Sequence, residues 1–456
     1  MDERIDSPEE QLKQLIHTYI EERRIEELRS LINEYHPADI ADVLDDLSPE
    51  EAVIIFDLLS NEVASEVLDE TGSLVRQEII EKVDDERLAD LLDELPMDDA
   101  AEFLDELPED TASRLIDLME PDEAEEVLEL LRYEDETAGR LMTRDVAALR
   151  RQWTAAEALQ YLRSLVLKDE AETVHYLYVV DRDNKLIGVV PIRALLMAQP
   201  DATIDSIMVP EVFTVQVTAD QEELAEVVSK YDFVAIPVVD TANQFLGVVT
   251  VDDVLDVVEE EATEDIQRLG GSEPLAQPYF SASVIQVVGK RLIWLLPLFA
   301  ASVVTDVIVE NYEWLTAAFI SLTFFVPVVI GTGGNAGSQT VATVIRAIAV
   351  GEVRLMDIGR AWSREASVGL ILGLVLGAAG FIRAQLFDAE LGVALVLALT
   401  LPLVVIWANT VATLVPLIAQ RLKIDPAVVS APMITTIVDA TGLFIYFSLA
   451  AIVLTQ

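Results

Sequence analysis

The chain has 456 residues, of which 52% are hydrophobic, yet its formal net charge is −51. A single ordinary domain does not combine these properties at this length, so the two halves are considered separately. Residues 278–456 hold ten acidic and nine basic side chains, which leaves 71 acidic and 21 basic ones in residues 1–277. The acidic half therefore repels nucleic acid and attracts cations. Cysteine is absent, which excludes a disulfide framework and thiolate metal sites.

Residues 1–136 are expected to form an acidic, all-helical N domain. Apolar residues recur at helical spacing from about Pro37 to Leu131, and proline recurs twelve and thirteen residues apart at Pro96, Pro108 and Pro121. Proline or an acidic residue in the first turn starts a helix, and repeated short helices stack into a superhelix. The sequence begins MDERIDSPEE without an apolar segment, so we expect no secretory signal and a cytoplasmic N domain.

Residues 137–200 and 201–257 carry one pattern twice. Short β-branched runs alternate with helical stretches in both copies, and Leu141-Met142-Thr143 matches Ile207-Met208-Val209. Such alternation predicts an α/β fold in each copy.

A second correspondence supports this duplication. A β-branched run ends at Asp181 and again at Asp240, and Gly188 and Gly247 follow seven residues later. The pattern resembles a tandem pair of CBS modules, which often bind adenine nucleotides. The residues that stand where a nucleotide base would stack are Tyr176 and Phe233. The sequence leaves open whether ATP binds there.

Residues 251–277 are expected to form a connecting helix and a linker to the membrane half. The helical run is rich in carboxylates and ends at Gly270-Gly271. Val254, Leu255 and Val258 follow helical spacing, so part of this helix is predicted to pack while its carboxylates face outward or across a gap between domains.

Residues 278–456 are expected to form a helical membrane domain. A helix needs about 20 apolar residues to cross a hydrocarbon core of about 30 Å. Five segments meet that length, near residues 291–309, 315–345, 366–387, 391–420 and 427–455. Basic residues cluster before the first segment and in the second and fourth connections. By the positive-inside rule this predicts a cytoplasmic N-terminus and an external C-terminus.

Two features of the membrane half predict a cation path. The second segment contains Gly331-Thr332-Gly333-Gly334-Asn335-Ala336-Gly337-Ser338-Gln339, and a backbone opened at that depth must line protein or water. The last segment carries Asp439, whose charge costs at least ~3 kcal/mol at the bilayer centre. Mg2+ dehydrates reluctantly and binds through one or two carboxylates plus waters, which suits this residue. The structural alternatives are close packing by the glycines and a protonated Asp439 bonded to Thr435. Asn409 is a weaker polar candidate.

The acidic helical domain, CBS pair, connecting helix and five spans together resemble the MgtE family of Mg2+ channels over nearly the whole chain. The specific matches are Gly333-Gly334-Asn335 with Gly337 and Gln339, the Asp425-Pro426 step, Asp439, and the helix from Asp253 to Asp265. The resemblance implies a homodimer with one pore at the shared axis, where Asp439 holds hydrated Mg2+. The pore-lining residues on this reading are Gly333, Gly334, Asn335, Asn409 and Thr435. Ser338 and Ala431 depart from residues frequent in the family.

The resemblance also implies that the connecting helix is a plug, locked when Mg2+ bridges acids of the N domain, the CBS pair and the helix. The matching acids are Glu66, Asp98, Glu102, Asp232, Asp253, Asp256, Glu261 and Glu264. Like charges ~4 Å apart repel by ~1 kcal/mol in water and ~4 kcal/mol at an effective dielectric of about 20, so such contacts require neutralisation.

The sequence therefore predicts a Mg2+ channel of the cell inner membrane that closes when cytoplasmic Mg2+ binds its acidic domains. There is no GxxxxGK[ST] motif and the three histidines are scattered, so active pumping and enzymatic activity are not expected. The alternative is a divalent-cation exchanger coupled to Na+ or H+ through the same Asp439. The other rivals are an intramembrane aspartyl enzyme that pairs Asp439 with Asp306, and a CBS-controlled nucleotide receptor without transport.

Overall fold

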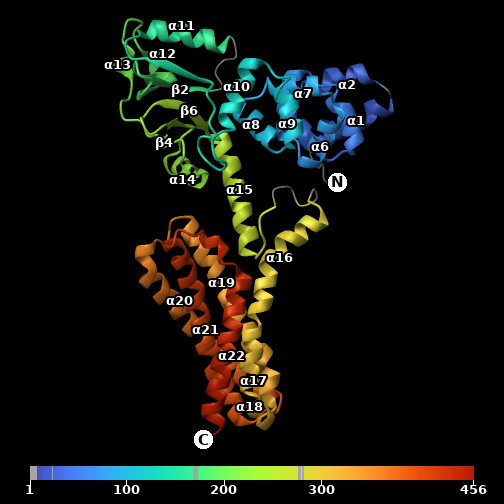
Figure 1. The fold of residues 1–456 in the computed structure, drawn as a ribbon, viewed down its shortest axis with the longest axis vertical. Coiled ribbons are helices and arrows are strands. Elements are labelled where there is room, and N and C mark those ends of the chain that lie inside the picture. Colours follow the sequence, from blue (N-terminus) through green and yellow to red (C-terminus); the bar gives the residue numbers. More distant parts are fainter. Residues whose placement is uncertain (1–7, 23, 168–172, 276–278, 280–281, 456) are drawn as a thin grey trace, which may run out of the picture. The chain divides into compact units, whose positions relative to one another are not determined.

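Two units divide the chain in this computed structural model, Met1–Glu260 and Glu261–Gln456. The structure describes residues 8–455 except 23, 168–172, 276–278 and 280–281. The helices and strands carry the labels of Figure 1.

Short helices make up the first part of the unit Met1–Glu260. They are α1 (Pro8–Glu21), α2 (Ile25–Ile32), α3 (Pro37–Asp45), α4 (Pro49–Phe56), α5 (Asn61–Glu70), α6 (Ser73–Lys82), α7 (Asp85–Leu92), α8 (Met97–Asp105), α9 (Glu109–Ile116) and α10 (Pro121–Leu130). Pro49 and Pro121 occupy the first turns of α4 and α10, where a missing N–H costs nothing. The Asp84 carboxylate accepts a hydrogen bond from Arg87 N at 3.0 Å at the start of α7. The prediction of an all-helical acidic domain is confirmed.

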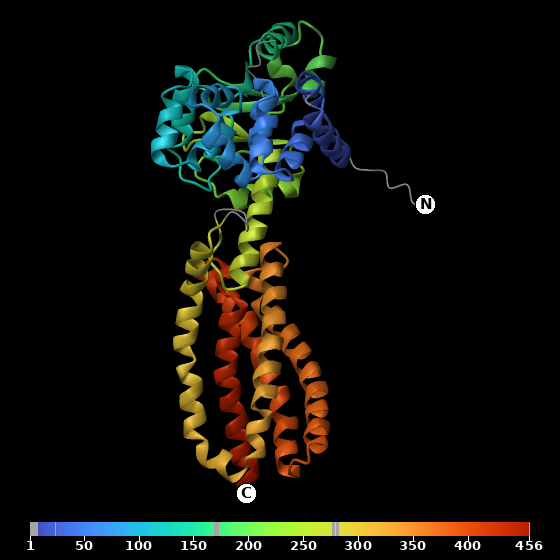
Figure 2. The same ribbon diagram turned by 90° about the vertical axis from the view of Figure 1, so that its right-hand side faces the viewer.

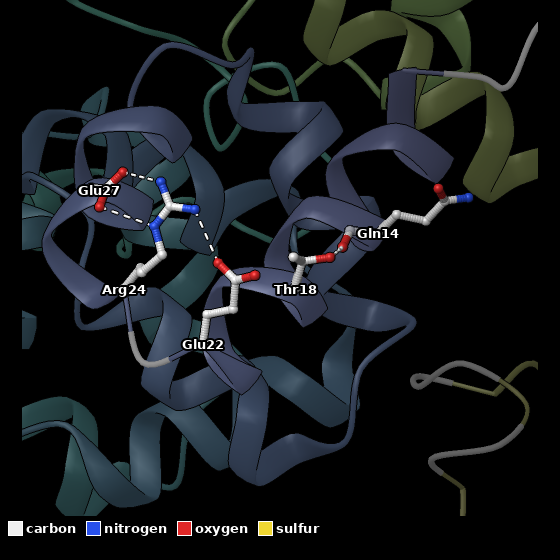
Figure 3. A network of polar contacts seen from close by, with 5 residues as sticks. All are labelled: Gln14, Thr18, Glu22, Arg24 and Glu27. Carbon is white, nitrogen blue, oxygen red and sulfur yellow. Dashed lines mark hydrogen bonds and ion pairs between the residues drawn. The ribbon is translucent and has the colours of Figure 1, made fainter.

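Arg24 holds the turn between α1 and α2 (Figure 3). Its Nη1 donates to Glu22 Oε2 at 3.0 Å and its Nε to Glu27 Oε1 at 2.9 Å, and Nη2 makes a further bond to Glu27. Within α1, Thr18 Oγ1 donates to Gln14 O at 2.8 Å. All five side chains are exposed, so these contacts order the turn without adding to the apolar core.

Two three-stranded sheets form the CBS pair. The first contains β1 (Val146–Arg150), β2 (Thr173–Val180) and β3 (Leu186–Pro191), and the second contains β4 (Val215–Gln216), β5 (Ala235–Val239) and β6 (Phe245–Thr250). In each sheet the first two strands are parallel and the last two antiparallel. The accompanying helices are α11 (Ala155–Val166), α12 (Ile192–Met197), α13 (Ile204–Ile207) and α14 (Gln221–Tyr231). The duplicated α/β pattern is therefore confirmed.

The matching motifs of the two CBS copies cross each other. Thr143 pairs with β6, where a Cβ on Gly247 would lie 2.4 Å from Thr143 O. Val209 pairs with β3 in the same way, beside Gly188. Each hairpin thus needs glycine because a backbone from the other copy passes over it.

The helix α15 (Val251–Leu269) continues from β6 across the boundary between the two units. Asp253 Oδ2 caps its start by accepting from Thr250 N at 3.1 Å and from Thr250 Oγ1 at 2.6 Å. Val254 and Val257 are buried, whereas Leu255 and Val258 are exposed. The predicted packing of Leu255 and Val258 is wrong, because the buried face of the helix is centred on the other side of Val254.

Val254 and Val257 belong to an apolar core shared by the N domain and the second CBS copy. Ile40, Phe56 and Leu68 are fully buried members of the same core. Burying each side chain of this size contributes ~1.5–3 kcal/mol. The first half of α15 is therefore part of this shared core.

Long helices make up most of the unit Glu261–Gln456, and Figure 2 shows them running alongside one another. They are α16 (Val284–Ala301), α17 (Val303–Asn311), α18 (Glu313–Ala318), α19 (Ser321–Ala349), α20 (Ile358–Leu386), α21 (Leu391–Arg421) and α22 (Ala431–Leu454), with 3-10 turns η1 (Leu355–Asp357) and η2 (Pro426–Val428). Glycines bring α20 close to α21: a Cβ on Gly373 would lie 2.5 Å from Pro402 Cα, and one on Gly377 2.5 Å from Ala398 O.

Four segments among the described residues are long and apolar enough to cross a membrane, namely Val284–Asn311, Leu355–Leu386, Leu391–Arg421 and Ala431–Leu454. The remaining expected span, near residues 315–345, corresponds to α19. This helix has 29 residues but contains a run of glycines and polar residues. The predicted opening of the backbone at residues 331–339 is wrong, because α19 is helical throughout. Five spans are thus not confirmed.

Candidate cation sites

Asp439 lies in the middle of α22, and its Oδ1 is buried without a hydrogen-bond partner. Thr435, one turn earlier, donates its hydroxyl to Pro432 O at 2.8 Å and not to Asp439. Gly334 of α19 faces this carboxylate, since a Cβ there would lie 3.7 Å from Asp439 Oδ1 and 3.2 Å from Thr435 Cγ2. An acceptor without a donor inside a membrane helix is suited to a cation.

The neighbouring glycines allow α19 to approach α22. A Cβ on Gly333 would lie 2.7 Å from Val404 Cγ1 and 2.8 Å from Val438 Cγ1. The glycines of α19 therefore serve close helix packing and also bring the α19 backbone near the Asp439 carboxylate, because small residues let two helices approach each other. Asn335, on the same helix, is exposed.

Asn409 lies in the α20–α21 interface and is 1% exposed. Its Nδ2 donates to Glu365 O at 3.2 Å and lies 3.5 Å from Glu365 Oε2. Thr340 of α19 donates to the same Oε2 at 3.4 Å. The sequence analysis missed Glu365, because it stands just before the apolar segment 366–387 among other charged residues.

Carboxylates of the N domain and of α15 lie close enough to raise each other's pKa. This acidic interface comprises Asp69, Glu70, Glu102, Glu106, Asp256 and Glu260. Burial, with the neighbouring Glu260, Glu106 and Asp69, raises the pKa of Glu102 to about 7. Burial also raises the pKa of Asp256, as do Glu70, Asp252 and Glu259. The pKa of both carboxylates is therefore raised, although both side chains remain in contact with solvent.

The predicted regulatory acids are divided among several places. Glu102 and Asp256 lie in the acidic interface, whereas Glu66 is exposed on α5 and Asp98 is buried on α8. Asp232 ends α14 with a left-handed backbone, φ 55°. Asp253 caps α15, and Glu261 and Glu264 belong to the second unit. Among the described residues no three His, Asp or Glu side chains are already grouped to hold a metal ion.

Four members of the acidic interface were not predicted: Asp69, Glu70, Glu106 and Glu260. The N domain carries acids on every helix, so spacing alone does not tell which ones face α15. Arg76 lies near Asp69 and favours its ionised form, but burial still raises the pKa of Asp69.

The end of α15 docks on the segment that leads into α22. Arg268 Nη1 donates to Asp425 Oδ2 at 2.6 Å, and the same guanidinium pairs with Glu264. Gly271 has a left-handed backbone, φ 75°, and a Cβ there would lie 3.0 Å from Pro432 Cγ. Pro432 stands in the first turn of α22, so the chain just after α15 lies close to the start of the helix that carries Asp439.

The two predicted nucleotide-stacking residues lie in different apolar clusters. Tyr176 is half-buried on β2, opposite Pro191. Phe233 is half-buried and stacks on Tyr231, with ring centroids 5.5 Å apart. No ring contact joins Tyr176 to Phe233 in the described part of the chain.

Comparisons with known proteins match these parts. The model of the divalent cation transporter family MgtE matches residues 326–449, that of the MgtE intracellular N domain residues 35–136, and that of the CBS domain residues 138–201 and 204–260. A magnesium transporter MgtE of Thermus thermophilus is 41% identical over 323 residues, or 71% of each chain. One of Enterococcus faecalis is 36% identical over 321 residues, or 70% of each chain.

Two solved structures resemble the N-terminal part of the chain. The soluble part of a magnesium transporter aligns with a TM-score of 0.52 and 31% identity, over 56% of this chain and 99% of that one. The cytosolic domain of the Mg2+ channel MgtE in complex with ATP aligns with a TM-score of 0.51 and 37% identity, over 54% of this chain and 99% of that one.

An acidic helical domain, a CBS pair and a membrane domain with a buried carboxylate define a divalent cation transporter. The matched family models and relatives specify it further. The chain belongs to the MgtE family of magnesium transporters, as its sequence motifs indicated, and that family is one of transporters and not of enzymes.

Proposed function

We propose that this chain is a Mg2+ channel of the cell inner membrane, open at low cytoplasmic Mg2+ and closed when Mg2+ binds its acidic domains. The observation that carries the proposal is Asp439, whose Oδ1 lacks a donor and faces Gly334 across a closely packed helix pair. Mg2+ retains several waters and binds through one or two carboxylates, so one such residue in each of two copies suffices. The pore residues of this proposal are Gly333, Gly334, Asn335, Thr435 and Asp439. Asn409, also predicted to line the pore, is left out because its amide contacts Glu365 of α20.

The proposed topology counts α19 as a span with the four apolar segments. Five spans place the N domain in the cytoplasm and the C-terminus outside, with Arg346, Arg354, Arg360 and Arg364 on the cytoplasmic side. An inside-negative potential then favours entry of a cation by ~2.3 kcal/mol per charge per 100 mV, and a dication gains twice that free energy. Influx needs no other energy source.

The acidic interface supplies the proposed sensor. Glu102 and Glu260 lie on opposite sides of it, and each added negative charge there opposes docking of the N domain on α15. Repulsion of ~1–4 kcal/mol per close pair becomes attraction when a divalent cation lies between the carboxylates. The full proposed set of sensing acids is Glu66, Asp98, Glu102, Asp232, Asp253, Asp256, Glu261 and Glu264.

Closure would reach the pore through α15. Its first half belongs, through Val254 and Val257, to the core shared by the N domain and the second CBS copy, and its last turn holds Asp425 through Arg268. A helix anchored at both ends transmits a displacement of one end to the other. We therefore assign α15 the role of the plug.

ATP is the proposed ligand of the CBS pair. A relative's cytosolic domain was crystallised in complex with ATP, and here Tyr176 and Phe233 each present a half-buried ring. Isothermal titration of the full chain with ATP tests the assignment. Phe233→Ala should abolish binding while Trp153→Phe, in the other CBS copy, leaves it unchanged; equal affinities in both variants would contradict the assignment.

Mg2+ uptake into proteoliposomes separates the channel from an exchanger coupled to Na+ or H+. Uptake is followed with an entrapped Mg2+-sensitive dye while a K+ diffusion potential sets the voltage. A channel gives uptake that grows with inside-negative voltage and ignores Na+ and proton gradients. Uptake that requires one of those gradients would support the exchanger.

A further inference from the structure

A polar cluster joins three helices of the membrane unit away from Asp439. It consists of Glu365 on α20, Thr340 on α19, and Asn409 and Thr413 on α21. Thr340 and Asn409 are 6% and 1% exposed and Glu365 is half-buried, so the cluster lies largely within the helix packing. Along α19, Thr340 stands about 9 Å from Gly334, at a rise of 1.5 Å per residue.

The Glu365 carboxylate has no counter-ion in this environment. No ion pair joins it to a basic side chain among the described residues. Residues 321–345 of α19 and 391–420 of α21 contain no ionisable side chain, and Asp439 is the only charged residue of α22. On α20, the helix of Glu365 itself, the nearest cationic side chains are Arg360 and Arg364, and both are exposed. An interior-facing carboxylate of a membrane helix requires a partner.

The polar contacts within the cluster leave this need unmet. Thr340 Oγ1 and Asn409 Nδ2 lie 3.4 Å and 3.5 Å from Glu365 Oε2, beyond the usual 2.7–3.2 Å of a good hydrogen bond. The Asn409 Oδ1 atom is buried and has no hydrogen-bond partner at all. Thr413 meanwhile fixes the Asn409 backbone by donating to Asn409 O at 2.7 Å.

The Asn409 amide offers two arrangements. As it stands, its nitrogen faces the Glu365 carboxylate, which suits a site without a cation. Half a turn of the amide exchanges nitrogen for oxygen, and two acceptors then face each other. A cation between the two oxygens makes that arrangement favourable, and it would also give the orphaned oxygen a partner.

We propose that Glu365, Asn409 and Thr340 form a second intramembrane cation site, for a small inorganic cation with oxygen ligands. The site offers one negative charge, one amide oxygen and one hydroxyl. Two cations share this chemistry: Mg2+, the transported ion, and Na+, the coupling ion of an exchanger. The site is distinct from Asp439 and from the acidic interface, so its failure would leave the proposed channel function intact.

Trp362 provides a local reporter. It lies one turn before Glu365, and its Nε1 donates to Thr410 Oγ1 at 3.2 Å, beside Asn409. The chain has five tryptophans, so replacing Trp153, Trp294, Trp314 and Trp407 by Phe leaves Trp362 alone. Its emission is then recorded for the full chain in lipid nanodiscs during titration with MgCl2 or NaCl, with choline chloride holding the ionic strength constant.

The proposal predicts a saturable change in Trp362 emission with one of the two salts, which identifies the cation. Glu365→Gln keeps the shape and removes the charge, and should weaken the response by roughly 10- to 100-fold. Thr340→Val should weaken it roughly threefold or more, and decides the matter if Glu365→Gln does not fold. Asp439→Asn is the matched control and should leave the response unchanged. An undiminished response in the folded Glu365 or Thr340 variant, or none to either salt in the parent chain, would overturn the proposal.

Discussion

Glu102 is the carboxylate whose neutralisation tests the acidic interface most sharply. Its pKa rises from 4.5 to about 7, which at ~1.36 kcal/mol per pKa unit sets an upper limit of ~3 kcal/mol. Because the side chain keeps contact with water, solvent screening reduces this to about 1 kcal/mol. The docked N domain holds the proton more tightly than the undocked one. Docking is therefore favoured fully below pH 4.5 and loses this contribution as the pH rises through about 7.

We expect Glu102→Gln to favour docking of the N domain by about 1 kcal/mol in Mg2+-free buffer at about pH 8, a roughly fivefold change in equilibrium. The absence of cysteine allows clean spin labelling. Labels at Leu118→Cys, after α9, and Leu196→Cys, in α12, use two exposed positions. Pulsed electron–electron double resonance then reports the distance between the N domain and the CBS pair.

In the parent chain the docked distance should gain population as the pH falls, and in Glu102→Gln this dependence should be weaker. Glu125→Gln, an exposed acid on α10, is the matched control and should behave like the parent. The reasoning about charge at this interface is wrong if the docked population of the parent chain does not depend on pH. It is also wrong if Glu102→Gln and Glu125→Gln show the same pH dependence.

Three further changes test other parts of the account. Arg268→Gln removes the 2.6 Å ion pair to Asp425, so the cytoplasmic Mg2+ concentration that halves the current should rise by roughly two- to tenfold; Lys82→Gln, an exposed ion-paired residue of α6, should not change it. Gly333→Ala places a Cβ 2.7 Å from Val404 Cγ1, so thermal unfolding should show a stability loss of ~1–3 kcal/mol in the membrane unit. Gly331→Ala has open space around it and should be tolerated. Equal losses in the two variants would contradict the packing argument. Gly247→Ala meets Thr143 O at 2.4 Å and should lower the melting temperature, while Gly359→Ala should not; an unchanged melting temperature for Gly247→Ala would show that the two CBS copies do not cross closely.

Local signals in the sequence predicted much of the cytosolic fold. A proline or an acidic first turn marks a helix start whatever surrounds it, as Pro49 and Pro121 show. The CBS duplication was visible because Gly188 and Gly247 must both stay small where a segment of the other copy crosses. The packed face of α15 was not predictable in the same way. Both Val257 and Leu255 are apolar, and only the packing of the neighbouring elements decides which of them is buried.

The membrane half shows the opposite limitation. A glycine-rich run in a sequence suggests a broken helix when the residues packed around it are unknown. In the structure α19 is one continuous helix, and Val404 and Val438 lie close beside Gly333. Asp439 could be found from sequence, since it is the only charge in its apolar segment. Glu365 could not, because it lies at the edge of a segment and its inward direction depends on the packing of α20 on α21.

Single-channel recording in a lipid bilayer tests the central claim most directly. Mg2+ is the main permeant cation, and its cytoplasmic concentration is stepped from micromolar to millimolar for the parent chain, Asp439→Ala and the control Asp306→Ala. The account predicts unitary currents at low Mg2+ that vanish at high Mg2+, persist in Asp306→Ala and are lost in Asp439→Ala. Unitary currents that survive in Asp439→Ala, or that ignore cytoplasmic Mg2+ in the parent chain, would contradict it.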